Sequence, residues 1–451
     1  MIKTVQGRSW TNWSQTFHCQ PQQILYPATI EEVCTLVNEA AANQKKIRIV
    51  GAGHSFTNLV QTNDWLVSLD LLSGIEKIDE VNETATVLGG TRLYEIGNEL
   101  GRLGYSQENL GDINVQSIAG ALSTGTHGTG MNFGIIATQV IELTLVTAEG
   151  EILIVSKKEN ASYFHACLVS LGSLGIIVKV VINIIKSPVY NYVSEKIPYT
   201  QLIENLDHYI NTNRHFEFYL FPYSDLVQIK TMNLSKNKPQ SLTLHHWKNL
   251  ILENYLFFLL SEVCRKFPKS SKVISRLSAK GVGNTSISAQ SYQLFATPRK
   301  VIFREIEYFI PLQSMKSAIQ EIRECIEENQ YNVHFPLECR TVKADEIWLS
   351  PAYKRDSAVI SFHMYKGMPY EQYFRDMEKI MKKYEGRPHW GKMHNQSSAH
   401  LHFLFPKLAD FLAIRQELDP NGIFLNNYVQ ELWEESMELA PKEVFFEKGH
   451  F

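Results

Sequence analysis

Two short segments in the last third of the chain place charged side chains at spacings that suit catalysis. Glu338 and Arg340 are two residues apart, so a strand would hold both side chains on one face. His389 and Lys392 flank a Trp-Gly pair. A carboxylate and a guanidinium on one face could line one wall of a site. Considered alone, the first pair is more simply a structural ion pair on a sheet, and the second a loop that packs its tryptophan.

Two glycine-rich runs lie in the first third of the chain. In the first, a predicted strand ends in Gly51-Ala52-Gly53-His54-Ser55, so the backbone can turn sharply and its N–H groups can approach a phosphate. A histidine in that turn would be held against whatever the turn binds. The second run, over 120–130, reads Gly-Ala-Leu-Ser-Thr-Gly-Thr-His-Gly-Thr-Gly.

Neither run fits the common nucleotide-binding motifs. Phe56 stands where a Rossmann fingerprint needs its third glycine for close packing of helix and strand. The second run has no Gly-Lys-Ser/Thr, so it lacks the phosphate-binding lysine and the magnesium-binding hydroxyl of a P-loop. Taken separately, each run could also be a plain turn.

Together with segments 117–120 and 170–178, the two runs resemble the PCMH-type FAD-binding domain of the vanillyl-alcohol-oxidase superfamily. In sugar-oxidising members, the histidine of the Gly-x-Gly-His-Ser motif is bonded to the 8α-methyl of FAD, which implies such a bond at His54. A neutral imidazole is a competent nucleophile for that bond. The alternative is a His54 that only hydrogen-bonds a non-covalent FAD. The resemblance implies FAD contacts at Gly51, Ala52, Gly53, His54, Ser55, Gly111, Ser117, Gly120, Thr124, Gly125, His127, Gly128, Gly175 and Ile177.

The two charged segments are similar to the aldonolactone oxidase and alditol oxidase branch of this superfamily, which contains gulonolactone and arabinonolactone oxidases. The similarity covers nearly the whole chain. It implies that Arg340 and Lys392 lie beside the isoalloxazine, that Glu338 hydrogen-bonds the substrate, and that His389 belongs to the same catalytic segment as Lys392. The expected reaction is oxidation of an alcohol by hydride transfer to flavin N5. Because the charged residues are all present, a flavin-binding protein without turnover is disfavoured.

Three further positions bear on the substrate. Asp112, Ser361 and His363 align with a serine, a histidine and a threonine that contact the polyol in alditol oxidases. These departures favour a sugar-1,4-lactone oxidised at C2, and an alditol is the alternative substrate.

The electron acceptor is indicated by Gly111. Lactone oxidases of this group tend to carry glycine where lactone dehydrogenases carry alanine, and a missing methyl would leave room for O2 at the flavin. The residue favours an oxidase that releases H2O2. The alternative is a dehydrogenase that passes electrons to a quinone or a cytochrome.

Composition limits the class of protein. The chain has 451 residues, 44% of them hydrophobic, and a formal net charge of −3, so we expect two or three soluble domains and no nucleic-acid partner. The six cysteines show no CxxC spacing, which argues against a zinc site and against disulfides, and we expect no metal. The N-terminus lacks the apolar core of a signal peptide, so a cytoplasmic location is expected.

The order of the expected elements predicts an α+β fold. A helix capped by Thr29 should precede a strand over 47–50, and strands then alternate with helices up to about residue 187. We expect a two-part FAD-binding domain, with residues 1–187 as its first part and a C-terminal segment, 407–451, returning to it. Residues 188–406 should form an α+β substrate (cap) domain.

One stretch has two interpretations. Residues 250–260 are strongly apolar, and six basic residues follow over 265–280 with no acid among them. The apolar run is too short to span a bilayer. It predicts either a buried helix of the cap with a solvated basic neighbour, or a peripheral membrane contact through 250–280.

Overall fold

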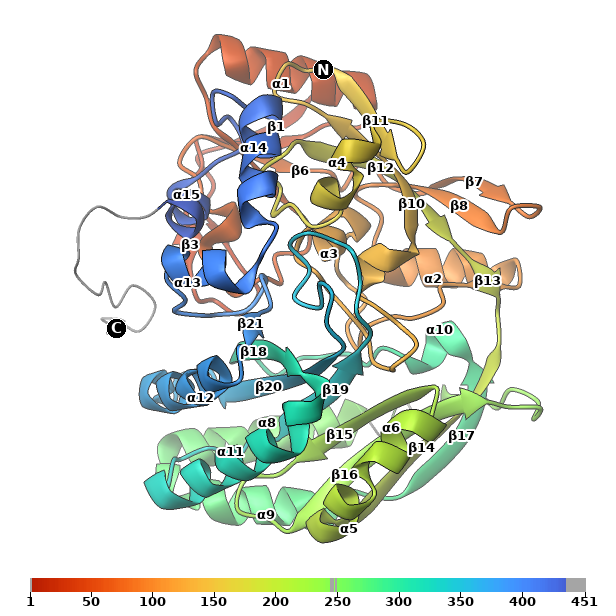
Figure 1. Cartoon of the computed structure of the whole chain (residues 1–451), viewed down its shortest axis with the longest axis vertical. Helices are drawn as coiled ribbons and strands as arrows, with labels where there is room; N and C mark the ends of the chain where they lie inside the picture. Colours follow the sequence, from red (N-terminus) through yellow and green to blue (C-terminus); the bar gives the residue numbers. More distant parts are fainter. Residues whose placement is uncertain (1, 244–246, 248–249, 435–451) are drawn as a thin grey trace.

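The computed structural model describes residues 2–243, 247 and 250–434. It confirms the α+β fold and has two halves, an upper one that contains both the first and the last helices, and a lower one built from the middle of the chain (Figure 1). Residues 435–451 of the expected C-terminal segment lie outside the described residues.

The elements of the upper half that precede the lower half are β1 (Lys3–Gln6), β2 (Trp10–Thr11), β3 (His18–Cys19), β4 (Gln23–Tyr26), α1 (Ile30–Ala42), β5 (Ile47–Val50), η1 (Asn58–Val60), β6 (Trp65–Ser68), β7 (Ile75–Asp79), β8 (Thr84–Leu88), α2 (Leu93–Arg102), β9 (Tyr105–Ser106), α3 (Ile118–Ser123), η2 (Ile136–Gln139), β10 (Val140–Val146), β11 (Ile152–Ser156), α4 (Ala161–Cys167), β12 (Ile176–Asn183) and β13 (Ile185–Lys186). The chain later returns to this half with α13 (Ser398–Leu404), α14 (Leu408–Leu418) and α15 (Asn427–Trp433).

The elements of the lower half are β14 (Val189–Pro198), α5 (Tyr199–Glu204), α6 (Leu206–Thr212), β15 (His215–Leu220), β16 (Leu226–Leu234), the π-helix η3 (Leu250–Leu256), α8 (Phe257–Lys266), η4 (Pro268–Ser270), α9 (Ser271–Gly281), β17 (Thr285–Gln290), α10 (Ser291–Leu294), β18 (Phe303–Pro311), η5 (Leu312–Ser314), α11 (Met315–Asn329), β19 (Leu337–Val342), β20 (Ser357–Tyr365), α12 (Glu371–Lys383) and β21 (Arg387–Pro388).

Local sequence signals explain the start of the upper half. The hydroxyl of Thr29 accepts a hydrogen bond from the N–H of Glu32, and the Glu32 carboxylate accepts one from the N–H of Ala28. The Thr29 cap fixes the start of α1, as predicted. Strand β5 then covers residues 47–50, also as predicted, and pairs in parallel with β6 inside a sheet of order β1-β4-β6-β5. A second sheet of the upper half has the order β11-β10-β12-β8-β7.

Arg48 ties the end of the described chain to the first half of the fold. Its guanidinium is buried and donates hydrogen bonds to the carbonyl oxygens of Leu59, Leu171, Gly172 and Phe424. Burial lowers the pKa of Arg48 to about 10, so the side chain stays charged near neutral pH. The backbone of segment 423–426 is thereby held against the strand that leads into the His54 turn.

The lower half is built on a sheet of eight strands in the order β17-β14-β16-β15-β19-β20-β18-β21. Because side chains alternate along a strand, one face of this sheet is apolar and packs against α11 and α12, with Ile360 and Phe362 of β20 in that cluster. The other face carries polar and charged side chains. The strands β15, β19, β20 and β18 lie next to each other in that order, so segments far apart in sequence supply one continuous polar surface.

Candidate active site

The turn after β5 leaves little room for a side chain at Gly51 or at Gly53. A Cβ at Gly51 would lie 2.3 Å from the Ser117 hydroxyl oxygen, and one at Gly53 would lie 2.7 Å from the ring of Trp10. Gly53 also has φ +67°, in the left-handed region. These constraints hold the next residue, His54, at one position beside the loop that contains Ser117.

His54 is packed and neutral. Its ring lies against that of Trp13, with centroids 5.0 Å apart and planes 20° from parallel. Burial, together with the nearby charges of Lys392 and Arg92, lowers the pKa of His54 to about 4. The imidazole is therefore uncharged near pH 7, which is the form that can act as a nucleophile.

The second glycine-rich run contains a short helix, α3, that the sequence did not predict. Ser117 caps this helix by accepting a hydrogen bond from the N–H of Gly120 at 3.3 Å. Beyond it, a Cβ at Gly128 would lie 2.3 Å from the carbonyl oxygen of Leu110, so this position also requires glycine. Glycine is needed at position 128 because the backbone of Leu110 passes close to it, and not because the segment has to be flexible.

The two runs border one cavity between the halves of the molecule. Its lining includes most of the positions at which FAD contacts were expected. These are Gly51, Ala52, Gly53, His54, Ser55, Gly111, Ser117, Gly120, Thr124, His127, Gly175 and Ile177. Gly125 lies outside the lining, against Pro351, and Gly128 lines a neighbouring cavity instead. The walls at the glycines are bare backbone, whose N–H groups suit the phosphates of a dinucleotide, so the residues present fit FAD.

The lower half contributes charged residues that the sequence predicted to the same cavity. Arg340, His389 and Lys392 line it, as does Asp112 from the upper half. The Trp390 side chain between His389 and Lys392 is fully buried and donates a hydrogen bond from its indole N–H to the carbonyl oxygen of Leu349 at 2.6 Å. This hydrogen bond anchors the 389–392 loop. Trp390 packs in the interior, as expected, while His389 and Lys392 line the cavity.

Arg340 lies at the centre of a buried charge network. Glu338 and Arg340 of β19 share a face and form an ion pair, which confirms the expectation from their spacing. The Arg340 guanidinium also lies 3.0 Å from a carboxylate oxygen of Glu217 and 3.2 Å from one of Asp112. Burial lowers the pKa of Arg340, but the three carboxylates raise it more, so the guanidinium stays charged.

Glu338 is the carboxylate of this network that most readily takes a proton. Burial raises its pKa, Arg340 lowers it, and the carboxylates of Asp112 and Glu217 raise it again, so the pKa lies above its ordinary value. The Tyr219 hydroxyl donates a hydrogen bond to Glu338 Oε1 at 2.6 Å, and Arg340 donates to the same oxygen. A carboxylate held in this way could accept a proton from a bound hydroxyl.

Lys392 has a buried carboxylate as its partner. Its ammonium nitrogen lies 2.5 Å from Glu305 Oε2, and His363 Nε2 lies 3.5 Å from Glu305 Oε1. Burial lowers the pKa of Lys392, but the carboxylates of Glu305 and Glu307 raise it above its ordinary value. Lys392 is therefore a fixed positive charge on the cavity wall.

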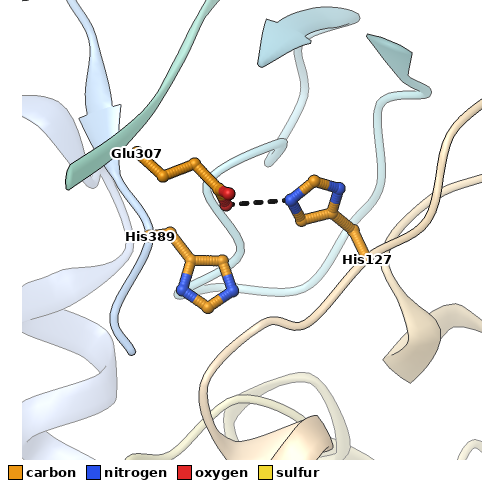
Figure 2. A group of neighbouring side chains, drawn as sticks. All are labelled: His127, Glu307 and His389. Atoms are coloured by element: carbon orange, nitrogen blue, oxygen red, sulfur yellow. Dashed lines mark hydrogen bonds and ion pairs between the residues drawn. The ribbon is translucent and has the colours of Figure 1, made fainter. Parts of the chain in front are cut away.

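Glu307 lies between two histidines (Figure 2). His127 Nδ1 is 2.8 Å from the Gly128 carbonyl oxygen, which only accepts, and Nε2 is 2.9 Å from Glu307 Oε1. Nδ1 must therefore carry a hydrogen, and a proton must also lie between Nε2 and the carboxylate. These groups and His389 have the chemistry of metal ligands, but 2.9 Å is the separation of a hydrogen-bonded pair. The Ser361 hydroxyl donates to the other oxygen, Glu307 Oε2, at 2.6 Å.

Asp112 is held by two cations. Its carboxylate lies 2.6 Å from an Arg299 nitrogen and 3.2 Å from Arg340. Burial raises the pKa of Asp112, but these arginines lower it well below the ordinary value, so the residue is ionised. Asp112 and Arg340 line both the main cavity and the neighbouring one.

Comparison with known proteins decides the family. Residues 21–156 match an FAD-binding domain, and residues 180–432 match the D-arabinono-1,4-lactone oxidase family. The L-gulono-1,4-lactone dehydrogenase of Mycobacterium tuberculosis is 35% identical to this chain, over 94% of the chain and 98% of the relative.

The chain belongs to the D-arabinono-1,4-lactone oxidase family.

Two other matches agree with this assignment. The L-gulonolactone oxidase of Scyliorhinus torazame is 31% identical over 96% of this chain and 99% of the relative. The cholesterol oxidase of B. sterolicum has the same fold, with a TM-score of 0.83 over 96% of this chain and 98% of that chain, at 17% sequence identity. The expected superfamily and branch are confirmed, and the protein is an FAD-dependent oxidoreductase of the D-arabinono-1,4-lactone oxidase family.

The sequence analysis missed several charged residues that the D-arabinono-1,4-lactone oxidase fold brings to the cavity region. Glu305 and Glu307 alternate with apolar residues in β18, and Glu217 interrupts an aromatic strand, β15. Carboxylates on otherwise apolar strands are rarely buried without a partner. This pattern in the sequence could have indicated that the three glutamates lie in a buried charged site. Arg299 precedes β18 in a loop without a recognisable motif, so only the structure identifies it.

Proposed function

We propose that this protein oxidises a sugar-1,4-lactone at the C2 hydroxyl. The observation that carries the proposal is that Arg340 of β19, paired with Glu338, and Lys392 of the 389–392 loop line the same cavity as His54. Bound FAD would supply the hydride acceptor there. The two relatives named above are a gulonolactone dehydrogenase and a gulonolactone oxidase, which supports a lactone substrate.

We assign separate tasks to the three charged side chains. Lys392, a fixed cation, would bind the C2 oxygen and stabilise its negative charge as the C–H bond breaks. Glu338, whose pKa is raised, would accept the hydroxyl proton. Arg340 would hold Glu338 in place and provide positive charge close to the flavin ring. The hydride and the proton both leave the substrate, so C2 becomes a ketone.

An alditol is the second candidate substrate. Of the three positions that contact the polyol in alditol oxidases, Asp112 is paired with arginines and the Ser361 hydroxyl donates to Glu307. His363 faces Glu305. The three side chains at the positions that bind the polyol in alditol oxidases are thus paired with other residues of this protein, which supports the lactone as substrate.

The decisive experiment is the visible spectrum of the yellow protein mixed without oxygen with an aldonolactone or with an alditol. Bleaching by the lactone alone would support the proposal. Bleaching by the alditol alone would replace the lactone with a polyol, and no bleaching by either would contradict both. Opening the bleached sample to air then measures the reaction with O2.

We propose that His54 carries FAD through an 8α-histidyl bond, because its ring is neutral and fixed by the glycine turn. In acid-precipitated wild-type protein, the flavin should remain in the pellet. In His54→Ala it should appear entirely in the supernatant, measured by absorbance and fluorescence. The control is His18→Ala, at an exposed position of the upper half, which should keep the flavin in the pellet. Release of flavin from the wild type would show that FAD is bound without a covalent link.

We propose O2 as the acceptor, with H2O2 as the product, because Gly111 lines the cavity without a side chain. A Cβ at this position would lie 3.0 Å from the carbonyl oxygen of His127, tight enough to narrow the space there. In Gly111→Ala, recolouring of the bleached enzyme in air should slow by about tenfold or more, while bleaching by the lactone keeps its rate. Equal recolouring of wild type and variant would favour the alternative, an acceptor such as a quinone or cytochrome, as the relative named a dehydrogenase suggests.

A peripheral contact of residues 250–280 with a membrane is also part of the proposal. Within residues 2–243, 247 and 250–434, no helix has both the length and the apolar character needed to cross a membrane.

A further inference from the structure

The helices η3, α8 and α9 expose an unusual amount of apolar surface. Eleven of the twenty exposed large hydrophobic side chains among the described residues lie between positions 247 and 277. Those on α8, α9 and their connection are Phe258, Leu259, Val263, Phe267, Val273 and Leu277. Their exposed fractions reach 61% at Leu259 and 68% at Phe267. We call this surface the 250–280 face; α8 and α9 lie in the lower half of the molecule (Figure 1).

The orientation of α8 and α9 is the reverse of that of an ordinary surface helix. Their buried positions are small or weakly polar, namely Ser261, Cys264, Ser271, Ser275 and Ala279, with Ile274 as the one large exception. Most of the large apolar residues are exposed instead, while Phe257 and Leu260 of α8 pack partly against the core. A contiguous apolar surface in water is unfavourable, and such surfaces commonly mark sites of association.

The same face is strongly basic. Residues 250–280 contain six basic residues and two acids, Glu253 and Glu262, in a chain whose net charge is −3. Arg265 pairs with Glu262, at 2.7 Å. For Lys266 and Lys269, no ion pair is found among the residues that the structure describes. The 250–280 face therefore combines outward apolar side chains with a local excess of positive charge.

We propose that the 250–280 face docks on an anionic lipid surface. Apolar side chains at this density would enter the boundary between headgroups and acyl chains, and the lysines and arginines would meet the lipid phosphates. A second copy of the chain fits less well. A symmetric dimer would bring two identical basic faces together, and like charges would oppose its formation.

The inner side of this face borders the candidate active site. The N–H of Lys300 donates to Asn254 Oδ1 of η3 at 2.8 Å, and the adjacent Arg299 pairs with Asp112 in the site. The Phe257 ring of α8 packs 4.7 Å from that of Phe335. A bilayer docked on the outer side would therefore be separated by one helix from the loop that carries Arg299. The inference does not depend on which substrate is oxidised.

Vesicle flotation with the full-length, flavin-loaded protein tests the docking. The expected result is binding to vesicles of phosphatidylcholine and phosphatidylglycerol in equal parts, weaker binding to phosphatidylcholine alone, and release in 1 M salt, where the screening length falls to about 3 Å. Absence of binding to the anionic vesicles at low salt would overturn the proposal.

Two double variants separate the contribution of the apolar side chains to vesicle binding from that of the basic side chains. Phe258→Ser with Leu259→Ser should abolish binding, and Lys266→Glu with Lys269→Glu should weaken it by at least ~25-fold, since each basic side chain near an anionic surface contributes roughly fivefold. The matched control is Leu103→Ser, which is 57% exposed in the upper half and should bind as the wild type does. An equal loss of binding in Leu103→Ser would contradict the proposal.

Folding and self-association are checked on the same samples. The flavin absorbance of each variant should equal that of the wild type, since none of the changed residues lines the flavin cavity. Sedimentation should give one mass for the wild type and the Phe258→Ser, Leu259→Ser variant. A wild-type dimer that this variant converts to monomer, with no binding to vesicles, would make a second copy the occupant and overturn the lipid assignment.

Discussion

Lys392→Ala is expected to slow the bleaching of the flavin by an aldonolactone by ~10²–10³-fold, the usual cost of removing one group that stabilises a developing oxyanion. The ammonium of Lys392 lines the cavity, and among the described residues its ion pair is with Glu305 of β18, at 2.5 Å. Its charge is therefore available to the substrate oxygen. The flavin content should stay near that of the wild type, because the glycine turn and α3 are untouched. Stopped-flow absorbance without oxygen measures the rate.

The variant also leaves the buried Glu305 carboxylate without its lysine partner, with His363 Nε2 at 3.5 Å, and this should lower stability. Lys392→Ala with Glu305→Gln removes that unpaired charge and should restore the melting temperature without restoring the rate. Lys392→Arg keeps a cation and should recover part of the rate. Lys366→Ala changes an exposed lysine at the end of β20 and serves as the control. A normal bleaching rate in Lys392→Ala would show that the assigned role is wrong.

Arg340→Leu is expected to lower the free energy of unfolding by ~3–5 kcal/mol, the range found when one partner of a buried ion pair is removed. Three carboxylates, those of Glu338, Glu217 and Asp112, lie around this guanidinium. Lys230 and Arg299 compensate only part of the charge that would be left. Urea unfolding followed by circular dichroism measures the loss.

The pH dependence of this loss identifies its cause. In the wild type, arginine lowers the pKa of Asp112 and of Glu217, so these groups add stability above their unfolded pKa values, and that stability disappears as the pH falls. Without Arg340, burial would be opposed only in part by Lys230 and Arg299, so the pKa of each carboxyl would rise, and protonation would relieve the repulsion. The difference between variant and wild type should therefore be larger at pH 8 than at pH 5. Arg304→Leu, on the opposite face of β18, should cost less than about 1 kcal/mol at either pH.

Much of the site was predictable because its motifs are local. The Thr29 cap, the strand over 47–50 and the glycine turn each depend on a few neighbouring residues. The pairing of Glu338 with Arg340 follows from the two-residue period of a strand. In each case the physical cause lies within one element, so the sequence shows it directly.

The partners across strands were not predictable in the same way. Tyr219 meets Glu338 only because β15 lies beside β19, although 119 residues separate the two. Glu307 reaches His127 over 180 positions, from one half of the molecule to the other. Without the order of strands in the sheet, no spacing rule identifies such partners. For the same reason the proton held between His127 and Glu307 could be inferred only from the coordinates.

The contact between Arg48 and segment 423–426 has a consequence for the synthesis of this protein. The carbonyl of Phe424 that Arg48 binds lies 376 positions further along the chain. At translation rates of roughly 5–20 residues per second, a ribosome takes about 20–75 s to cover that distance. Until then, Arg48 lacks one of its carbonyl partners, and segment 423–426 does not yet pack beside the strand that leads into the glycine turn. Binding of FAD should accordingly be a late event, completed after the polypeptide leaves the ribosome.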